Sequence, residues 1–320
     1  MEHEVRAEKT SWWNHFIKSE FFYHYKNNLP AIIGSILVLF AILTAVAGRF
    51  LAPQNPYDLT QISLMDSYLP PAWLDGGKLS FLLGTDEQGR DILSAIIYGS
   101  ASSIMIGLVG MAASCCIGTT LGLIAGYFGG KVDAVIMRIA DIQLSFPSML
   151  IALFIMSVFG RGVGKLLIAL TMVGWVTYAR TVRGETLSVK KMEYVEAART
   201  IGLPNRIIIL KHVLPNVINS IIVLATIQIG NFILTEATLS FLGVGVPITE
   251  PSLGLLVKTG FDVLFSGLWW ASVFPGLYIM LIVFGINLLA LCHLPAEGGG
   301  CLRGLRVDHQ TRHAGVQPVN

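Results

Sequence analysis

The chain has 320 residues, of which 53% are apolar and 13% are charged, and its formal net charge is +2. Soluble globular domains carry about 25% charged residues, so this composition excludes an ordinary soluble protein and indicates a membrane protein. The near-neutral charge provides no basic field for nucleic acid, and the seven His and four Cys form no metal-ligand or disulfide pattern.

Six stretches of the sequence are long and apolar enough to be transmembrane helices, each of which needs about 20 residues. The first 28 residues are polar, and we expect no cleaved signal peptide there. The sequence therefore predicts an all-α polytopic membrane protein with six transmembrane helices. The predicted spans are Leu29–Leu51, Ser102–Phe128, Ile142–Phe159, Leu166–Tyr178 with its flanks, Val217–Leu242 and Leu268–Leu291.

The distribution of Lys and Arg predicts the orientation of these spans. Thirteen of them fall in residues 1–28 and in the loops after the second and fourth spans, against six on the other side. Because basic loops stay in the cytoplasm, we expect the N-terminus inside, residues 52–98 outside and the loop 180–216 in the cytoplasm.

The second span carries Gly118, Gly122 and Gly126 at intervals of four residues, which places them on one helix face. Such small-xxx-small spacing lets a neighbouring helix approach closely. We interpret the three glycines as packing positions rather than as contacts with a substrate.

Two polar segments on the predicted outer side invite a ligand interpretation. The acidic turn from Asp86 to Asp91 suits a cation, but Asp91 precedes a helical run toward Ser94, which favours a helix cap. The segment Gly160–Lys165 resembles a phosphate loop only superficially. Phe159 stands where its first Gly is required and Leu166 follows the Lys, so we expect a turn and no nucleotide site.

Glu236 is the one ionisable residue placed well inside a predicted span. Such residues are costly in lipid and face a cavity or a partner. Two interpretations stay open for it, a place near the substrate path and a contact with another subunit or with the backbone.

The predicted cytoplasmic segment 193–216 is the most informative part of the chain. Good helix formers with acidic residues at the start predict a short helix from Glu193 to Ile201, ended by Gly202. A second short helix is predicted from Ile207 to Val213, stopped at Leu214-Pro215. We expect small Ala residues on the exposed surface of the first helix, and His212 to be a packed side chain rather than a ligand.

This segment resembles the cytoplasmic loop of binding-protein-dependent ATP-binding cassette (ABC) importer permeases, whose Glu-Ala-Ala motif is followed six residues later by Gly and twelve residues after that by Leu-Pro. The resemblance implies helices that dock on an ATPase subunit. It implies that this contact, on coupling loop 180–216, involves Glu196, Ala197, Ala198, Gly202, Leu214 and Pro215.

Segments 83–94, 126–133 and 239–245, with the additional N-terminal span, resemble the dipeptide/oligopeptide group and its C-type subunit. The resemblance implies one N-terminal helix joined to a five-helix permease core over residues 99–291. It also implies a bacterial inner-membrane complex with a second related permease, two ATPases that hold ATP and Mg²⁺, and an external solute-binding protein. No catalytic residue, metal or cofactor is expected on this chain.

The sequence departs from the family pattern at two places. Leu253 stands where a Trp is usual, and after Leu289 the family's Gly-Asp continuation is replaced by a Gly- and Cys-containing stretch. We interpret residues 292–320 as an atypical tail, and our hypothesis is a frameshift near the end of the gene, which resequencing of the locus would test.

Other transport and enzyme classes fit the sequence less well than the importer does. Relatives in the group carry nickel or other small solutes, so that substrate class stays open. An ion-coupled secondary transporter needs inverted repeats and midplane ionisable residues, and an intramembrane enzyme needs paired polar groups at depth. The spans show neither pattern, and neither class accounts for the Glu-Ala-Ala loop.

Overall fold

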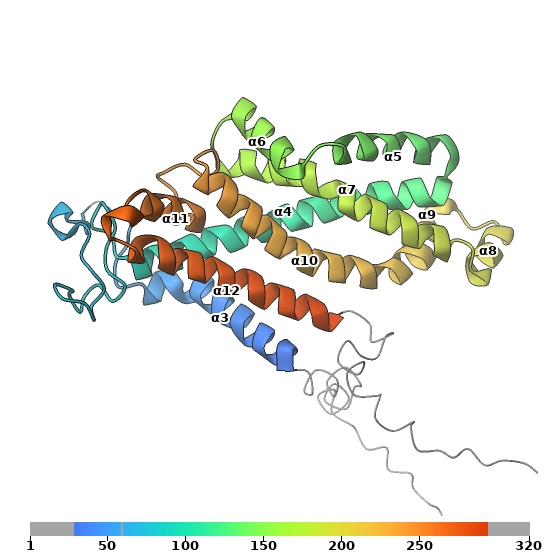
Figure 1. The fold of residues 1–320 in the computed structure, drawn as a ribbon. Helices are drawn as coiled ribbons and strands as arrows, with labels where there is room; N and C mark the ends of the chain where they lie inside the picture. Colours follow the sequence, from blue (N-terminus) through green and yellow to red (C-terminus); the bar gives the residue numbers. More distant parts are fainter. Residues whose placement is uncertain (1–28, 59, 294–320) are drawn as a thin grey trace, which may run out of the picture.

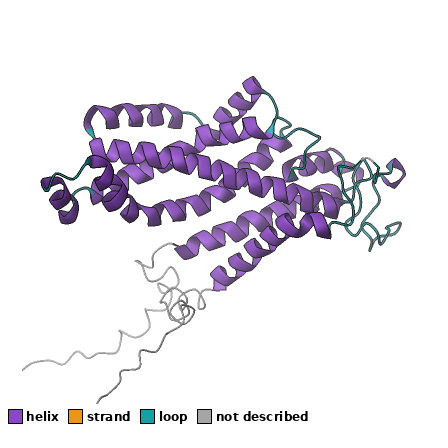
Figure 2. Ribbon diagram, turned by 180° about the vertical axis from the view of Figure 1, so that it is seen from behind, coloured by secondary structure: helices purple, strands orange, loops and turns teal. Residues whose placement is uncertain are grey.

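The computed structural model describes residues 29–58 and 60–293, which fold almost entirely into helices (Figure 1). No strand occurs in this part of the chain (Figure 2), so the predicted all-α class is confirmed. The long helices are α3 (Leu29–Leu51), α4 (Ile92–Phe128), α5 (Gly130–Leu144), α6 (Ser148–Phe159), α7 (Val163–Val189), α10 (Leu214–Phe241) and α12 (Trp270–His293). The short ones are η1 (Leu64–Asp66), α8 (Glu193–Thr200), α9 (Asn205–Ile207), the π-helical η2 (Ile208–Val213), α11 (Leu253–Asp262) and η3 (Leu264–Ser266).

Four helical stretches in the described residues are long and apolar enough to cross a membrane: Leu29–Gly48, Ile92–Phe128, Asn205–Phe241 and Trp270–Leu291. Helices α5 and α6 meet the same criterion as a bent pair. The 27 residues of α7 extend over about 40 Å. With α7 and the bent pair counted, the structure is consistent with the predicted six crossings.

The third predicted span is not one helix. The chain bends by 87° between α5 and α6, so the prediction of a continuous helix from Ile142 to Phe159 is wrong. Pro147 disfavours the helical conformation for the residue before it, and the helix ends at Leu144. The 12 residues of α6 extend over only about 18 Å, less than the hydrocarbon core.

Two other predicted spans are too short. Helix α4 begins at Ile92, well before the predicted start at Ser102, because Asp91 caps its first turn. Helix α7 continues to Val189, so the first part of the loop predicted over 180–216 is helical. The polarity of residues 180–189 predicted a loop. These residues contain no proline, however, and they continue helix α7.

The most extensive helix packing in the described residues joins α4 to α7. A Cβ atom added to Gly118 would lie 2.4 Å from the carbonyl oxygen of Trp175, and one added to Gly122 would lie 2.6 Å from that of Ala179. Gly126 lies against the same helix one turn further on. No side chain larger than hydrogen fits at these three positions, so the glycine face of α4 allows the two backbones to come together.

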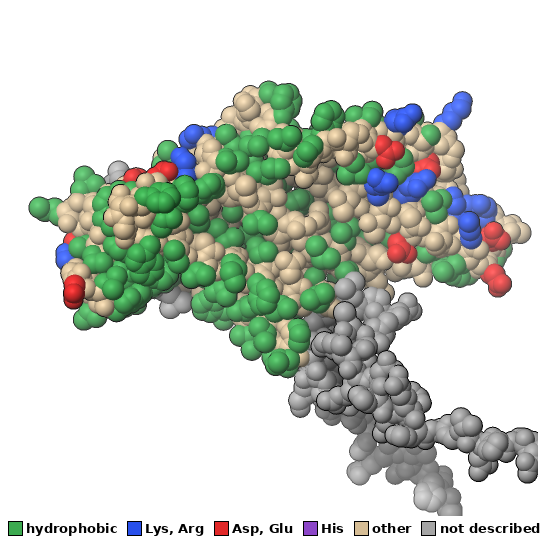
Figure 3. Space-filling model, in the orientation of Figure 1, with side chains coloured by type: hydrophobic (Ala, Val, Ile, Leu, Met, Phe, Trp, Pro, Cys, Tyr) green, Lys and Arg blue, Asp and Glu red, His purple; other side chains and the backbone are tan. Residues whose placement is uncertain are grey.

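Charged side chains gather at the two ends of the molecule, and apolar ones cover its middle (Figure 3). One end carries α8, α9 and the C-terminal ends of α4 and α7 (Figure 1). The other end carries α11 and the loop between α3 and α4. The residues predicted as the tail 1–28, and the predicted tail beyond His293, lie outside the described part of the chain.

Candidate functional site

Helix α8 projects from one end of the bundle (Figure 1). Two glutamates in its first turn lie at the positive end of the helix dipole, which favours them. The helix ends in Gly202, whose φ of +83° is open to a residue without a Cβ atom. The amide of Leu203 donates to the carbonyl of Ala198 at 3.1 Å and that of Gly202 to Arg199 at 3.0 Å. These two bonds form a Schellman cap, which fixes where the chain turns.

The side chains of α8 divide into an exposed and a buried set. Glu196, Ala197 and Gly202 are exposed, whereas Val195 and Ala198 are buried. The prediction that Ala198 lies on the surface with Ala197 is therefore wrong. Positions three residues apart share a helix face, so Ala198 follows Val195 into the interior.

The exposed end of α8 also presents large apolar side chains. Ile201 is 79% exposed, and Tyr194 and Leu203 are exposed as well. Exposed apolar groups gathered around small residues are typical of a protein–protein contact. This surface, made of Tyr194, Glu196, Ala197, Ile201, Gly202 and Leu203, is referred to below as the α8 surface.

Polar contacts connect α8, and the segments on either side of it, to the end of α4. The guanidinium carbon of Arg199 lies 5.5 Å from the centre of the Tyr127 ring, and the Tyr127 hydroxyl donates to Asn205 Oδ1 at 2.8 Å. Lys190 Nζ donates to the carbonyl of Gly126 at 2.7 Å. Sequence reasoning missed these contacts because Tyr127 and Asn205 are 78 residues apart and no local pattern links them.

Leu214 and Pro215 do not end a helix. The helical path runs from Asn205 through the π turn η2 into α10, so the predicted stop at Leu214-Pro215 is wrong. Pro215 lies in the first turn of α10, where its missing amide costs little, and the π turn changes the hydrogen-bond register before it. Leu214 is half-buried against the core, Pro215 is exposed, and the His212 ring packs 6.5 Å from that of Tyr194.

Glu236 lies in α10 and is fully buried. Its Oε2 accepts a hydrogen bond from Ser103 of α4 at 2.8 Å, and its Oε1 accepts from Ser240 at 3.0 Å and from Ser252 at 2.8 Å. Ser252 is also the N-cap of α11. The carboxylate thus joins three helices within the chain, a set of contacts that the two sequence interpretations did not include.

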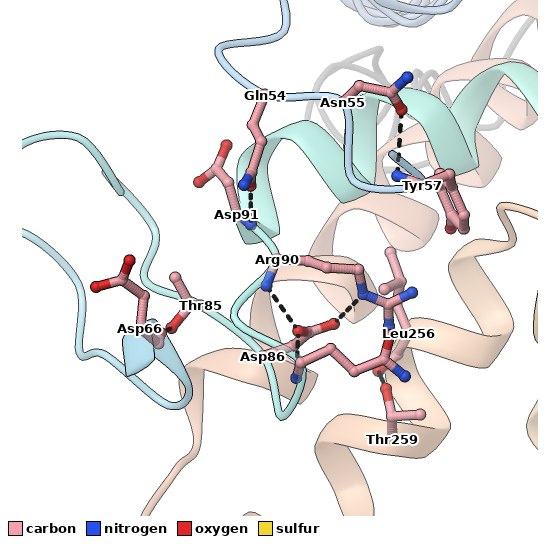
Figure 4. Close-up of polar contacts among 11 residues, drawn as sticks. Gln54, Asn55, Tyr57, Asp66, Thr85, Asp86, Arg90, Asp91, Leu256 and Thr259 are labelled. Atoms are coloured by element: carbon pink, nitrogen blue, oxygen red, sulfur yellow. Dashed lines mark hydrogen bonds and ion pairs between the residues drawn. The ribbon is translucent and has the colours of Figure 1, made fainter. Parts of the chain in front are cut away.

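The opposite end of the molecule is organised by the loop between α3 and α4 (Figure 4). The buried side chains of Asp86 and Arg90 form an ion pair at 2.6 Å, and the Arg90 guanidinium lies 5.7 Å from the centre of the Tyr57 ring. Burial raises the pKa of Tyr57 to about 12. Asp91 accepts from the Ser94 amide at 2.9 Å as the N-cap of α4, so the capping interpretation is confirmed.

The other candidate ligand groups are dispersed. Within residues 29–58 and 60–293 no three His, Cys, Asp or Glu residues gather as a metal site would require. Cys115 and Cys116 are free thiols of α4. Gly160 and Gly162 form the turn between α6 and α7, and Lys165 belongs to the first turns of α7, so the segment has no phosphate-loop structure.

Comparison with known proteins identifies the chain's relatives. Residues 118–293 match the model of the binding-protein-dependent transport system inner membrane component, and residues 19–71 match that of the N-terminal transmembrane domain of oligopeptide transport permease C. The chain is 36% identical to a dipeptide transport system permease protein of Haemophilus influenzae, over 84% of this chain and 90% of the relative. It is 38% identical to the Escherichia coli dipeptide permease over 84% and 89%, and 34% identical to an oligopeptide permease of Bacillus subtilis over 88% and 90%.

Proposed function

The chain belongs to the family of binding-protein-dependent transport system inner membrane components, and we propose from this membership that it is the C-type permease subunit of an ABC importer for dipeptides or oligopeptides. The observation that carries the mechanism is the α8 surface. It is a fixed, exposed and partly apolar element at the charged end of an otherwise apolar helical bundle.

The chain works in this proposal as one subunit of a larger assembly. A second related permease completes the solute pathway, two ATPase subunits hold ATP and Mg²⁺, and an external binding protein delivers the solute. This chain supplies neither catalytic residues nor a cofactor site. Its role is to convert the movement of the ATPases into a movement of its transmembrane helices.

The α8 surface is the proposed ATPase contact. Glu196, Ala197 and Gly202 are exposed members of this surface. Of the other residues predicted for the contact, Ala198 is buried beneath it, and Leu214 and Pro215 lie at the start of α10. Small Ala197 permits close approach of a groove in the ATPase. Since α8 is fixed to α4 through Arg199 and Tyr127, a push on α8 acts directly on a helix of the bundle.

The proposed location is the bacterial inner membrane, with the N-terminus and α8 in the cytoplasm. The excess of Lys and Arg on the α8 side supports this orientation. In this arrangement residues 1–28 form a cytoplasmic tail and residues 52–91 an external loop, which precedes the core. The same importer class carrying nickel or another small solute is the nearest alternative, and an ion-coupled transporter is a more distant one.

Uptake by the purified complex in proteoliposomes tests the proposal. We expect ATP-dependent accumulation of labelled dipeptides or oligopeptides when the binding protein is present. Uptake of Ni²⁺ but not of peptides would favour the alternative substrate. Uptake driven by an ion gradient without ATP would contradict an importer of this class.

A pair of variants tests the role of the α8 surface. Ala197→Arg places a large charged group on its exposed face, and we expect it to abolish uptake and solute-stimulated ATPase activity without unfolding the chain. Ser188→Arg, at an exposed position near the end of α7, is the matched control and should retain both. Equal activity of the two variants would remove α8 from the coupling mechanism.

A further inference from the structure

A groove runs along the outside of the bundle between α4 and the continuous path formed by α9, η2 and α10. One part of it is a cavity of about 410 Å³ with an almost wholly apolar lining. From α4 it is lined by Cys116, Leu123 and Ile124, and from the other wall by Leu210 and Ile218. Within the described chain no charged side chain lines this part.

At the end nearest α8 the groove becomes polar. A second cavity, of about 460 Å³, is lined by Tyr127, Phe128 and Asn205 together with the basic residues Lys190, Lys191 and Arg199 and the single acid Glu196. None of the three cations forms an ion pair with another residue in the described part. Three cations against one carboxylate give the lining of this cavity a net positive charge.

The two cavities are consecutive along both walls. On α4 the lining passes from Cys116 through Leu123 to Tyr127, which are one or two turns apart on one face. On the other wall it passes from Ile218 through Leu210 to Asn205 in the same direction. The two cavities therefore follow one another along the groove, which is apolar toward the middle of the membrane and basic at its edge.

This order of surfaces matches the chemistry of a phospholipid. Aromatic side chains such as Tyr127 and Phe128 favour the headgroup layer, where a lipid phosphate lies. Arg and Lys bind phosphate oxygens through charge-assisted hydrogen bonds, and basic pockets at the cytoplasmic ends of transmembrane helices bind anionic headgroups. An acidic protein partner would match the basic end but would leave the apolar part unexplained.

We propose that this groove binds an anionic phospholipid of the inner leaflet, with an acyl chain between α4 and α10 and the headgroup phosphate among Lys190, Lys191 and Arg199. The assignment to the inner leaflet rests on the orientation given under Proposed function. A lipid held there lies beside Tyr127, Asn205 and Arg199, the side chains that connect α8 and α9 to α4. The lipid would therefore stabilise the connection through which α8 acts on the bundle.

Native mass spectrometry of the purified complex, titrated with lipid, tests this site. We expect dioleoyl phosphatidylglycerol to bind more tightly than dioleoyl phosphatidylcholine, which has the same tails but no net charge. Lys191→Gln and Arg199→Gln should each weaken the binding of phosphatidylglycerol about fivefold. Lys131→Gln, which removes an exposed cation of α5 outside the groove, is the matched control and should leave it unchanged.

Two further experiments distinguish a bound phospholipid from other ligands of the groove. Leu210→Trp narrows the apolar part at an exposed position and should weaken phosphatidylglycerol binding while thermal stability is retained. Inorganic phosphate should not displace the lipid at equal concentration. Equal binding of the two lipids, displacement by phosphate alone, or lipid binding only after removal of the ATPase subunits would overturn the proposal. Because binding is measured without transport, these results do not depend on the uptake assay.

Discussion

At the scale of single residues, Asp91 combines a cap with a buried charge. Its side chain accepts hydrogen bonds from the Ser94 amide and hydroxyl at the start of α4, while its Oδ1 is buried without a partner. Burial raises the pKa of the Asp91 carboxyl above its ordinary value, against the opposing effect of the Ser94 hydrogen bonds. The hydrogen bonds therefore stabilise the start of α4, whereas burial of the charged carboxylate lowers the stability of the fold.

Asparagine at position 91 should keep the cap and remove the charge. A carboxyl whose pKa is higher in the folded chain favours folding at low pH, and this contribution is lost as pH rises through the folded pKa. The stability of Asp91→Asn relative to wild type should therefore rise as the pH increases from the ordinary aspartate pKa of about 4 toward neutral. Asp91→Ala also loses the cap, so it should be less stable than Asp91→Asn by about 1 kcal/mol at every pH.

Thermal unfolding of the purified complex in detergent across this pH range measures both variants. The informative quantity is the difference between each variant and wild type at the same pH, because other groups titrate as well. If Asp91→Asn were less stable than wild type at pH 7, the carboxylate charge would be favourable in the fold.

Glu236 presents a second residue-scale case, because three serine hydroxyls share one buried carboxylate. Glu236→Ala leaves these hydroxyls without their acceptor and should lower the stability by about 3 kcal/mol or more. Glu236→Gln keeps one acceptor oxygen and the side-chain volume, so we expect a smaller loss and an assembled complex. The two unfolding midpoints, with uptake as a second readout, test the role of the carboxylate.

Uptake separates the structural role of Glu236 from a role in the solute path. A structural role predicts that Glu236→Gln transports at a rate close to that of wild type once its stability is taken into account. A stable, assembled Glu236→Gln complex without uptake would place the carboxylate in the path. Ser103→Ala, which removes one of the three donors, is the matched control for the packing.

At the scale of elements, the glycine face of α4 sets how closely α7 approaches. Because a Cβ atom at Gly122 would lie 2.6 Å from the Ala179 carbonyl oxygen, Gly122→Ala requires the two helices to move apart. We expect this variant to lose about 1–3 kcal/mol, as overpacked interiors do. Gly184→Ala meets no atom within 4 Å and should be neutral or slightly stabilising. Unfolding midpoints that are equal for the two variants would contradict close packing at this face.

Apolar periodicity and length predicted most elements, since α3 and α12 begin and end within two residues of the predicted spans. The errors have local physical causes. Average hydropathy over a stretch of sequence does not reveal the bend before Pro147. The charged residues in the second half of α7 led to the prediction of a loop, although Arg183 there pairs with Asp133 at 2.6 Å within the fold.

The candidate site was predicted in its position but not in its detail. The Glu-Ala-Ala pattern located α8, and Gly202 predicted its end. The burial of Ala198 follows from helix periodicity relative to a core that only the fold defines. The contacts of Arg199 with Tyr127 and the shared hydrogen bonds of Glu236 join distant segments, so no local pattern in the sequence indicates them.

At the scale of the whole molecule, two chemically different ends flank an apolar middle (Figure 3). The α8 end is rich in Lys and Arg, whereas the other end carries the folded loop with its buried ion pair of Asp86 and Arg90. This asymmetry is the physical basis of the proposed orientation, because translocating a basic segment is unfavourable.

Cysteine labelling in cells tests that orientation directly. In a background without the four native cysteines, Met65→Cys and Lys131→Cys place thiols at exposed positions near the two ends. A membrane-impermeant maleimide should label Met65→Cys in intact cells and Lys131→Cys only after permeabilisation, with both fully labelled then. The opposite pattern would place α8 outside the cell. The α8 surface would then be out of reach of a cytoplasmic ATPase, and the proposed coupling could not operate.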